Sequence, residues 1–480
     1  MKLQRSLTLA SLLVFGACAV NPATGRRELA LVSESAEIQM GRDADPQIVA
    51  QLGLVEDEGL QRYVSDLGRE LAEVSERPDL PWTFRVVDDP TVNAFALPGG
   101  FIYVTRGILL NFDSEAELAG VLGHEIGHVT ARHSVSQMSR QQLQQIGLGV
   151  GMVLSENVRQ YGGLLSAGMQ LLNLSYSRDD ETQSDELGLR YISSLGYDPT
   201  AMIGVFDMLA QAGGGQDGEG RIPEWQLTHP YPENRAENIR SFIAEEGLPT
   251  SGTVERDTYL AQLDGVVYGE NPRHGYFKDA RFVHPELAFE LTFPSGWRTI
   301  NQRSVVAAIE PSQEAIVTLE VAEEESDPGA ALRTFLAQEG IMGGTVREDT
   351  SGGVQRARAD FEAATEEGPV RGEVAFMRHG SLTYRMLGYA PNAAAWPRHA
   401  GSVSSTVTSF GALTDRAILG AQPWTVEIRT LRSATSLNTY AANNPSPVGI
   451  EQLARLNRVT PQDVLDGGTS IKWVVGEPLP

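Results

Sequence analysis

His124, Glu125 and His128 are the residues whose types and spacing point most clearly to chemistry. On a helix, residues four apart lie on one face about one turn along the axis, so both imidazoles can reach a single metal ion. Zinc binds imidazole nitrogens at about 2.0–2.1 Å and lowers the pKa of its bound water toward ~7. The carboxylate of Glu125 can take a proton from that zinc-bound water as the water attacks a peptide carbonyl. The pattern therefore predicts hydrolysis at zinc, with Glu125 as general base.

A catalytic zinc ion needs a third protein ligand. His133 lies five residues beyond His128 and about 140° round the helix, which is more typical of a solvated residue or of one that supports a ligand. Glu181 and Asp185 are four apart on another predicted helix and share a face. One carboxylate can bind the metal while the other holds a histidine N–H from behind. The alternative is a pair of solvated acidic side chains in the first turns of that helix.

The helix that carries the two histidines has a clear start. Ser114 can cap it, and Glu117, three residues later, completes a capping box. A second helix, predicted over about 179–195, would carry the two carboxylates. Helical spacing of apolar residues predicts two further amphipathic helices within 34–74. Strands of a small sheet are predicted at 84–87 and 101–105.

Four ordered segments, within about residues 21–245, resemble the zinc metalloproteases of family M48. Residues 124–133 resemble the zinc-binding helix of that family, and residues 176–199 resemble its second motif. The resemblance implies that Glu181 is the third ligand of one Zn²⁺ per chain and that Asp185 is the supporting carboxylate. It also implies a mainly helical, gluzincin-type catalytic domain with a small sheet.

The third segment, residues 93–100, precedes the strand that the resemblance makes the substrate-binding edge. Pairing of this edge with an extended peptide would use main-chain hydrogen bonds and so tolerate many substrate sequences. The residues predicted to form the edge are Phe101, Ile102, Tyr103 and Val104.

The fourth segment contains Thr228-His229-Pro230 and Arg235. The resemblance implies that His229 lies near the zinc, where it would steady the oxyanion or cap the metal in a resting state. The alternative is a structural histidine at the start of a helix, with Arg235 in a salt bridge.

The first residues resemble those of a bacterial lipoprotein. An apolar run over 7–15 is followed by a lipobox-like sequence that ends at Cys18, the only cysteine of the chain. We therefore predict a signal peptide at 1–17, lipidation of Cys18 and a tether over 18–33. Ala19 resembles the sorting signal of outer-membrane lipoproteins, which implies a periplasmic protein anchored to that membrane. Elsewhere no apolar run approaches the ~18 residues of a membrane span.

Composition limits the classes of partner. The 480 residues include 38 basic and 62 acidic ones, a formal net charge of −24, which argues against binding the nucleic-acid backbone. Hydrophobic residues at 41% and charged residues at 21% are typical of a globular protein. The length predicts several domains.

The pattern of predicted helices and strands changes after the catalytic domain, which we place at 34–245. A linker is predicted over 246–274, followed by an α+β domain of open role over 275–415. Residues 422–480 resemble a LysM module, a small βααβ fold that binds peptidoglycan. The Gly-Asp-Thr expected in its first half is replaced within 431–437, so glycan binding and a pure packing role are equal alternatives.

Together these features predict a multidomain α+β protein that acts as a lipid-anchored zinc endopeptidase. Its expected substrates are unfolded or misassembled envelope proteins, with peptidoglycan as a further candidate partner. One alternative is an envelope scaffold or chaperone with little turnover, which Glu125→Gln would leave functional. The other is a peptidoglycan hydrolase, suggested by the terminal module alone.

Overall fold

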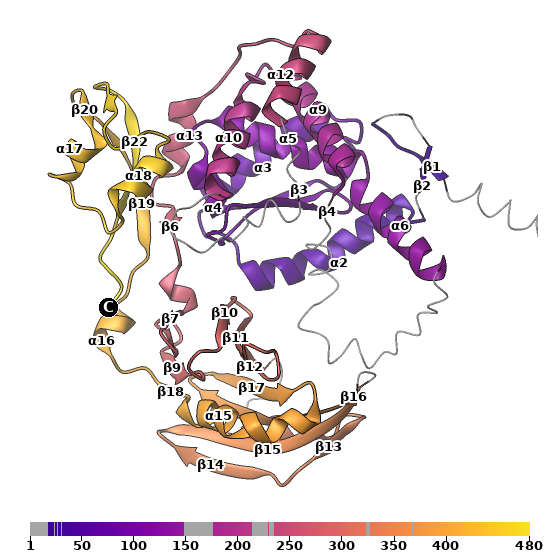
Figure 1. The fold of residues 1–480 in the computed structure, drawn as a ribbon, viewed down its shortest axis with the longest axis vertical. Helices are drawn as coiled ribbons and strands as arrows, with labels where there is room; N and C mark the ends of the chain where they lie inside the picture. The colour runs from indigo at the N-terminus through magenta and orange to yellow at the C-terminus, as the bar shows by residue number, and fades with distance from the viewer. Residues whose placement is uncertain are drawn as a thin grey trace, which may run out of the picture. The chain divides into compact units, whose positions relative to one another are not determined.

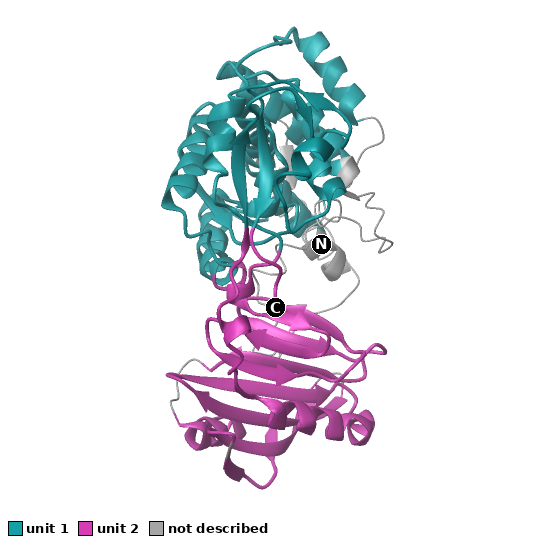
Figure 2. Cartoon of the chain, turned by 90° about the vertical axis from the view of Figure 1, so that its left-hand side faces the viewer, with its two compact units in different colours: residues 1–49, 53–269, 425–475 teal, residues 50–52, 270–424, 476–480 magenta. Residues whose placement is uncertain are grey.

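The computed structural model describes residues 18–23, 25, 27–29, 31–147, 176–213, 229, 235–322, 327–365 and 368–480. The chain divides into two compact units (Figure 2). Unit 1 comprises residues 1–49, 53–269 and 425–475, and unit 2 comprises residues 50–52, 270–424 and 476–480. The predicted signal peptide lies outside the described residues. Within the described ranges, every helix is too short or too polar to cross a membrane.

Helix α5 (Glu115–Thr130) is the centre of unit 1 and is buried from Ala116 to its last residue (Figure 1). Its predicted N-cap is confirmed, because Ser114 Oγ accepts a hydrogen bond from the backbone N–H of Glu117 at 3.3 Å. The carboxylate of Glu117 accepts from the N–H of Asp113 at 2.7 Å, one residue before the position that a capping box would use. The other described helices of this unit that precede residue 269 are α2 (Glu34–Leu52), α3 (Glu58–Glu73), α4 (Arg106–Asn111), α6 (His133–Gly147), α9 (Arg178–Ser194), α10 (Ala201–Gly213), α12 (Arg235–Glu246) and α13 (Arg256–Gln262).

A three-stranded sheet has the order β3-β5-β4. Strand β5 (Phe101–Thr105) pairs in parallel with β3 (Thr83–Val87) and antiparallel with β4 (Ala94–Leu97). The prediction that residues 101–104 form a free substrate edge is therefore wrong, because neighbouring strands pair with both sides of β5. Among the described strands of this sheet, β4 is the outer strand on the side of β5 opposite β3.

The segment predicted as a tether makes contacts with helices. Strands β1 (Cys18–Val20) and β2 (Arg27–Leu29) pair antiparallel. Asn21 Nδ2 donates to the carbonyl of Ala131 at 3.2 Å, just beyond α5, and the N–H of Leu31 donates to Ser139 Oγ of α6 at 3.0 Å. Residues that follow Cys18 are thus bonded to the end of the central helix.

Unit 2 is an α+β structure whose main sheet has the order β10-β11-β12-β17-β16-β15-β13, with β14 also paired to β15. Helices α14 (Pro328–Leu336) and α15 (Trp396–Ser409) pack on its two faces with separate apolar cores. The strands of this sheet are β10 (Arg298–Asn301), β11 (Val305–Ile309), β12 (Ile316–Val321), β13 (Ile341–Gly343), β14 (Arg347–Ser351), β15 (Val354–Thr365), β16 (Gly368–His379) and β17 (Leu382–Ala390). A smaller sheet contains β7 (Tyr276–Lys278), β8 (Arg281–His284), β9 (Phe289–Thr292) and β18 (Gly411–Ala412), and short helices are η1 (Pro272–His274), η2 (Ala393–Ala395) and α16 (Arg416–Leu419).

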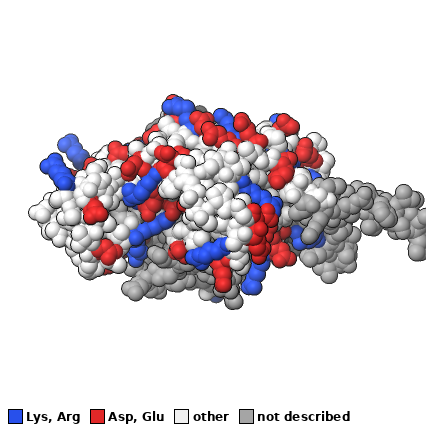
Figure 3. Space-filling model, turned by 90° about the horizontal axis from the view of Figure 1, so that it is seen from above, with Lys and Arg blue, Asp and Glu red and all other residues white. Residues whose placement is uncertain are grey.

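The C-terminal module begins with β19 (Trp424–Thr430) and ends with β22 (Ser470–Val475), which pair antiparallel. Between them lie β20 (Thr435–Ser436), α17 (Leu437–Ala441), α18 (Ile450–Leu456) and β21 (Val464–Leu465). Strand β6 (Val267–Tyr268), from the segment predicted as a linker, adds to β19 and completes a three-stranded sheet. On the face drawn in Figure 3, acidic and basic side chains are interspersed.

Candidate metal centre

Four buried side chains converge in unit 1: His124, His128, Glu181 and His229. One nitrogen or oxygen atom from each lies within 4.8 Å of the others. His124 Nε2 is 3.0 Å from His128 Nε2, and Glu181 Oε1 is 3.3 Å from His128 Nε2 and 2.9 Å from His229 Nδ1. Tetrahedral zinc with bonds of about 2.0–2.1 Å places its ligand atoms about 3.3 Å apart. The chemistry and spacing of this donor set therefore fit a zinc ion.

The outer nitrogen of His124 is held by a charged pair. His124 Nδ1 lies 2.9 Å from Asp185 Oδ1. Arg235 binds the same carboxylate through two hydrogen bonds of 2.7 Å, from Nε to Oδ2 and from its terminal nitrogen to Oδ1. Burial raises the pKa of Asp185, but Arg235 and His124 bring it below its usual value. An ionised Asp185 fixes the imidazole so that Nε2 points into the cluster, the support expected for a metal ligand.

The outer nitrogen of His128 is held by a second chain of side chains. His128 Nδ1 lies 2.9 Å from His133 Nδ1, and His133 Nε2 lies 2.9 Å from Gln183 Oε1. The ring of Tyr176 stacks on His128 at 3.8 Å between centroids, and its hydroxyl lies 2.9 Å from Ser134 Oγ. His133 is buried, which favours the supporting role over the solvated one. Tyr176, which precedes α9, and Gln183, within α9, were not predicted as site residues, because nothing in their spacing distinguishes them from ordinary residues of a helix and its flank.

Glu125 is fully buried beside the cluster. Neither of its carboxylate oxygens accepts a hydrogen bond from a described residue, and Oε1 lies 3.6 Å from His229 Nε2. Burial raises the pKa of Glu125, while His229 and His124 lower it, with a net rise. A buried carboxylate without a hydrogen-bond donor costs free energy, so its placement here indicates a functional and not a stabilising role. The arrangement suits a group that accepts a proton.

Burial and neighbouring charges shift the pKa values of the residues in the cluster in different directions. Burial alone would raise the pKa of Glu181, yet His229 and Arg235 hold it well below its usual value. Burial lowers the pKa of His128 well below its usual value. For His229 burial lowers the pKa, but the carboxylates of Glu181 and Glu125 produce a net rise. Glu181 is thus an ionised carboxylate and His128 a neutral imidazole, the protonation states that a metal requires of its ligands.

Close contact between α5 and α9 brings the carboxylates opposite the histidines. A Cβ added at Gly188 of α9 would lie 2.9 Å from the backbone nitrogen of His124, and one at Gly127 of α5 would lie 3.0 Å from the carbonyl of Ser184. Both approaches are shorter than ordinary van der Waals contact. Glycine at these positions lets the two backbones approach, so that Glu181 reaches the histidines of α5.

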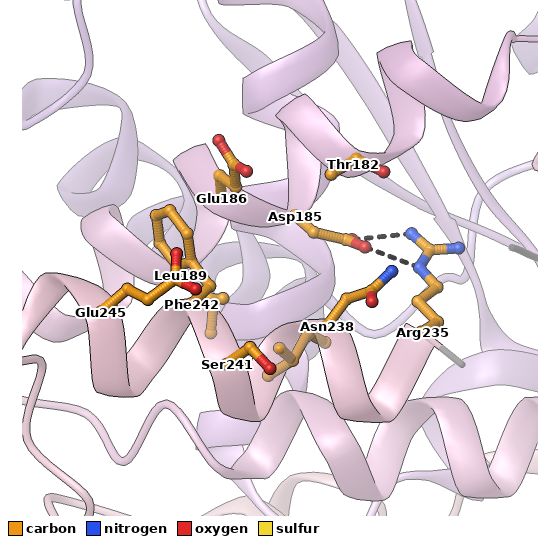
Figure 4. Close-up of a pocket in the computed structure, with 10 residues that line it drawn as sticks. Thr182, Asp185, Glu186, Leu189, Arg235, Asn238, Ser241, Phe242 and Glu245 are labelled. Carbon is orange, nitrogen blue, oxygen red and sulfur yellow. Dashed lines mark hydrogen bonds and ion pairs between the residues drawn. The ribbon is translucent and has the colours of Figure 1, made fainter. Parts of the chain in front are cut away.

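A cavity of about 310 Å³ lies between α9 and α12, next to the metal cluster. Figure 4 shows Asp185 and Arg235 joined at one side of it. Because the same two side chains contact His124 and Glu181, the cavity borders the residues that hold the ligands. Its other lining residues are Thr182, Glu186, Leu189, Asn238, Ile239, Ser241, Phe242 and Glu245.

The structure brings most of the predicted site residues together, but some of them lie elsewhere. The predicted residues that meet in the cluster and its surroundings are His124, Glu125, His128, Glu181, Asp185, His229 and Arg235. Residues 101–104 lie in the central strand of the sheet, and Cys18 lies in β1. Thr228 and Pro230 lie outside the described residues.

Part of the chain matches a known protein family. Residues 58–243 match Peptidase family M48. The beta-barrel assembly-enhancing protease of Yersinia pestis is 31% identical over 281 residues, which cover 56% of this chain and 55% of that protein. The mitochondrial metalloendopeptidase OMA1 of Schizosaccharomyces pombe is 31% identical over 234 residues, 47% of this chain and 66% of that protein.

The chain thus spans about half the length of the bacterial relative that it matches. Among solved structures, cyanobacterial PsbP from Synechocystis sp. PCC 6803 aligns with 28% of this chain and 91% of its own. Its TM-score of 0.22 and identity of 11% are too low to support an argument about either unit.

Proposed function

We propose, on the premise that residues 58–243 form a domain of peptidase family M48, that this chain is a zinc-dependent endopeptidase. The observation that carries the proposal is the buried cluster of His124, His128 and Glu181 beside the carboxylate of Glu125. This combination supplies three ligands of the types that zinc prefers and a proton acceptor within the same enclosed site.

Each residue has a separate task in this proposal. His124, His128 and Glu181 hold the ion, which, when bound, supplies a Lewis acid that makes a water molecule acidic near neutral pH. Glu125 accepts the proton of the attacking water at its carboxylate and returns it to the nitrogen of the departing amine. Asp185 and Arg235 keep His124 oriented throughout, because their own hydrogen bonds are buried and charged.

His229 occupies the fourth corner of the cluster. Its Nδ1 lies 2.9 Å from Glu181 Oε1 and 3.4 Å from His124 Nε2, while its Nε2 lies 3.6 Å from Glu125 Oε1. In this position an imidazole takes the place that water or substrate would use. We therefore favour the resting-state cap over the oxyanion role for His229. The oxyanion role would require His229 to move away from Glu181 first.

The proposed substrates are unfolded or misassembled envelope proteins. This proposal draws on the bacterial relative, a beta-barrel assembly-enhancing protease. The outer strand β4 (Ala94–Leu97) is a candidate to pair with an extended substrate in place of residues 101–104. We also propose that Cys18 is lipidated and anchors the chain to the outer membrane, facing the periplasm.

The test is cleavage of unfolded casein by protein that lacks residues 1–18, with zinc measured by mass spectrometry. Wild type should hold about one zinc ion, as a three-ligand site predicts, and should cleave casein. Glu125→Gln should hold zinc without cleaving. Absence of zinc after careful loading would refute the metal assignment, and would make the scaffold the leading function. Cleavage by Glu125→Gln at the wild-type rate would refute the role of the general base.

A further inference from the structure

The C-terminal module, residues 425–475, belongs to the same compact unit as the peptidase domain. Its strand β19 pairs with β6, which follows the peptidase helices in the chain. The N–H of Val426 donates to the carbonyl of Val266 at 2.9 Å, and Arg256 of α13 donates to the carbonyl of Ser470 at 3.1 Å. Figure 1 shows the module beside α13 and β6.

Lys472 of β22 is the most buried cation of this contact, with no solvent exposure of its side chain. Its Nζ donates to the carbonyls of Leu110 and Phe112 at 2.9 and 2.8 Å, and lies 3.0 Å from Asp113 Oδ1. The backbone of Lys472 is itself bonded on both sides to the side chain of Asn457. The ammonium group therefore has three oxygen partners, all of them outside the module.

Arg458 makes the second polar connection. It donates to Glu117 Oε1 at 2.5 Å and to the carbonyl of Asn111 at 2.7 Å. Its backbone is left-handed, with φ of 53°, a conformation that costs free energy in a residue other than glycine. The module thus holds this arginine in an unfavourable conformation while the side chain reaches the first turn of α5.

These contacts complete the end of α4. The last carbonyls of a helix have no partner within it and need side chains or water. Tyr259 donates to the carbonyl of Leu109 at 2.7 Å, and the module supplies the donors for the next three carbonyls. Asp113 and the N-cap of α5 follow at once, so the same contacts border the start of the helix that carries His124 and His128.

We infer that residues 425–475 are a permanent internal partner of the peptidase domain, docked by Lys472 and Arg458 on the corner between α4 and α5. The docking surface is the row of carbonyls over 110–112 together with Asp113 and Glu117. This surface suits a partner that presents two cations at fixed positions, and the module presents those of Lys472 and Arg458. The module therefore stabilises the start of the zinc helix and is not a separate unit that moves freely on a linker.

Hydrogen exchange on the full chain tests this inference. Amides over 106–120 and over 425–475 should exchange as one slow group in wild type. Lys472→Met removes three oxygen contacts but keeps the length of the stem. It should speed exchange in both segments by about tenfold or more, since it deletes several charge-assisted hydrogen bonds. Arg432→Met, an exposed position of the same module, should leave both segments unchanged.

Faster exchange in the module alone, with 106–120 at the wild-type rate, would overturn the inference, and so would no change in either segment. Should Lys472→Met fail to fold, Asp113→Asn removes the carboxylate partner from the peptidase side and should speed the same two segments. The exchange readout needs neither zinc nor cleavage. A negative exchange result would therefore refute the docking of the module without bearing on the proposed peptidase function. Only a measurement of casein cleavage by Lys472→Met would depend on that function.

Discussion

Replacing His133 with phenylalanine should weaken zinc binding although His133 is not a ligand. In the cluster, Nε2 of His128 faces the other ligand atoms, so the neutral ring carries its proton on Nδ1. That proton points to Nδ1 of His133, 2.9 Å away. His133 must then carry its own proton on Nε2, which lies 2.9 Å from the acceptor oxygen of Gln183. Each hydrogen bond of this chain then has one donor and one acceptor, with His133 Nδ1 accepting from His128 and His133 Nε2 donating to Gln183.

The size of the effect follows from the lost acceptor. Phenylalanine has a similar ring but no nitrogen, so the N–H of His128 would stay buried without a partner. Such a group costs about 1–3 kcal/mol. Loss of an outer hydrogen-bond partner typically weakens metal binding about 10–100-fold, which corresponds to about 1.4–2.7 kcal/mol. We therefore expect the Kd of His133→Phe for zinc to rise by about one to two orders of magnitude.

The assay is competition for zinc with a fluorescent chelator, with the fold of each variant checked by circular dichroism. His133→Asn offers a side-chain oxygen as acceptor and should recover part of the affinity. His399→Phe, a partly buried histidine of unit 2 paired with Glu314, should bind zinc as wild type does. A Kd of folded His133→Phe within about twofold of wild type, less than about 0.4 kcal/mol, would refute the reasoning.

Three other predictions concern the same site. Gly188→Ala should destabilise the chain by about 1–3 kcal/mol in urea unfolding, because its Cβ would lie 2.9 Å from the backbone nitrogen of His124. The control Gly401→Ala, whose Cβ would meet nothing within 4 Å, should not lower the free energy of unfolding. Equal stability of the two variants would contradict the close contact between α5 and α9. Despite burial, Arg235 lowers the pKa of Asp185, so this pair stabilises the fold above the unfolded pKa and loses that contribution as pH falls through the lower folded value. In chelator, the free energy of unfolding of wild type should fall more steeply below about pH 4 than that of Asp185→Asn, and parallel curves would contradict the pairing. His229→Ala should cleave casein faster than wild type at equal zinc content if His229 caps the resting site, whereas slower cleavage would favour the oxyanion role.

The sequence by itself determined those features that depend on a few adjacent residues. The helical period places His124 and His128 on one face whatever surrounds them, so their spacing was enough to predict a shared ion. The N-cap at Ser114 was predictable for the same reason, since its hydrogen bond spans three residues. The two helices within 34–74 and the strands near 84–87 and 101–105 were predictable from the spacing and types of their own residues.

The tertiary structure alone decided which remote segments meet. Alternation and β-propensity identify 101–105 as a strand, but they carry no information about its neighbours, and the pairing of β5 on both sides depends on where β3 and β4 pack. The partner of His133 is another such case, because Gln183 reaches it from α9, across a helix contact that glycines make possible. The same holds for Lys472, whose partners lie 360 and 362 residues away in the chain. Contacts of this kind depend on the packing of whole elements, which the local pattern of residues does not specify.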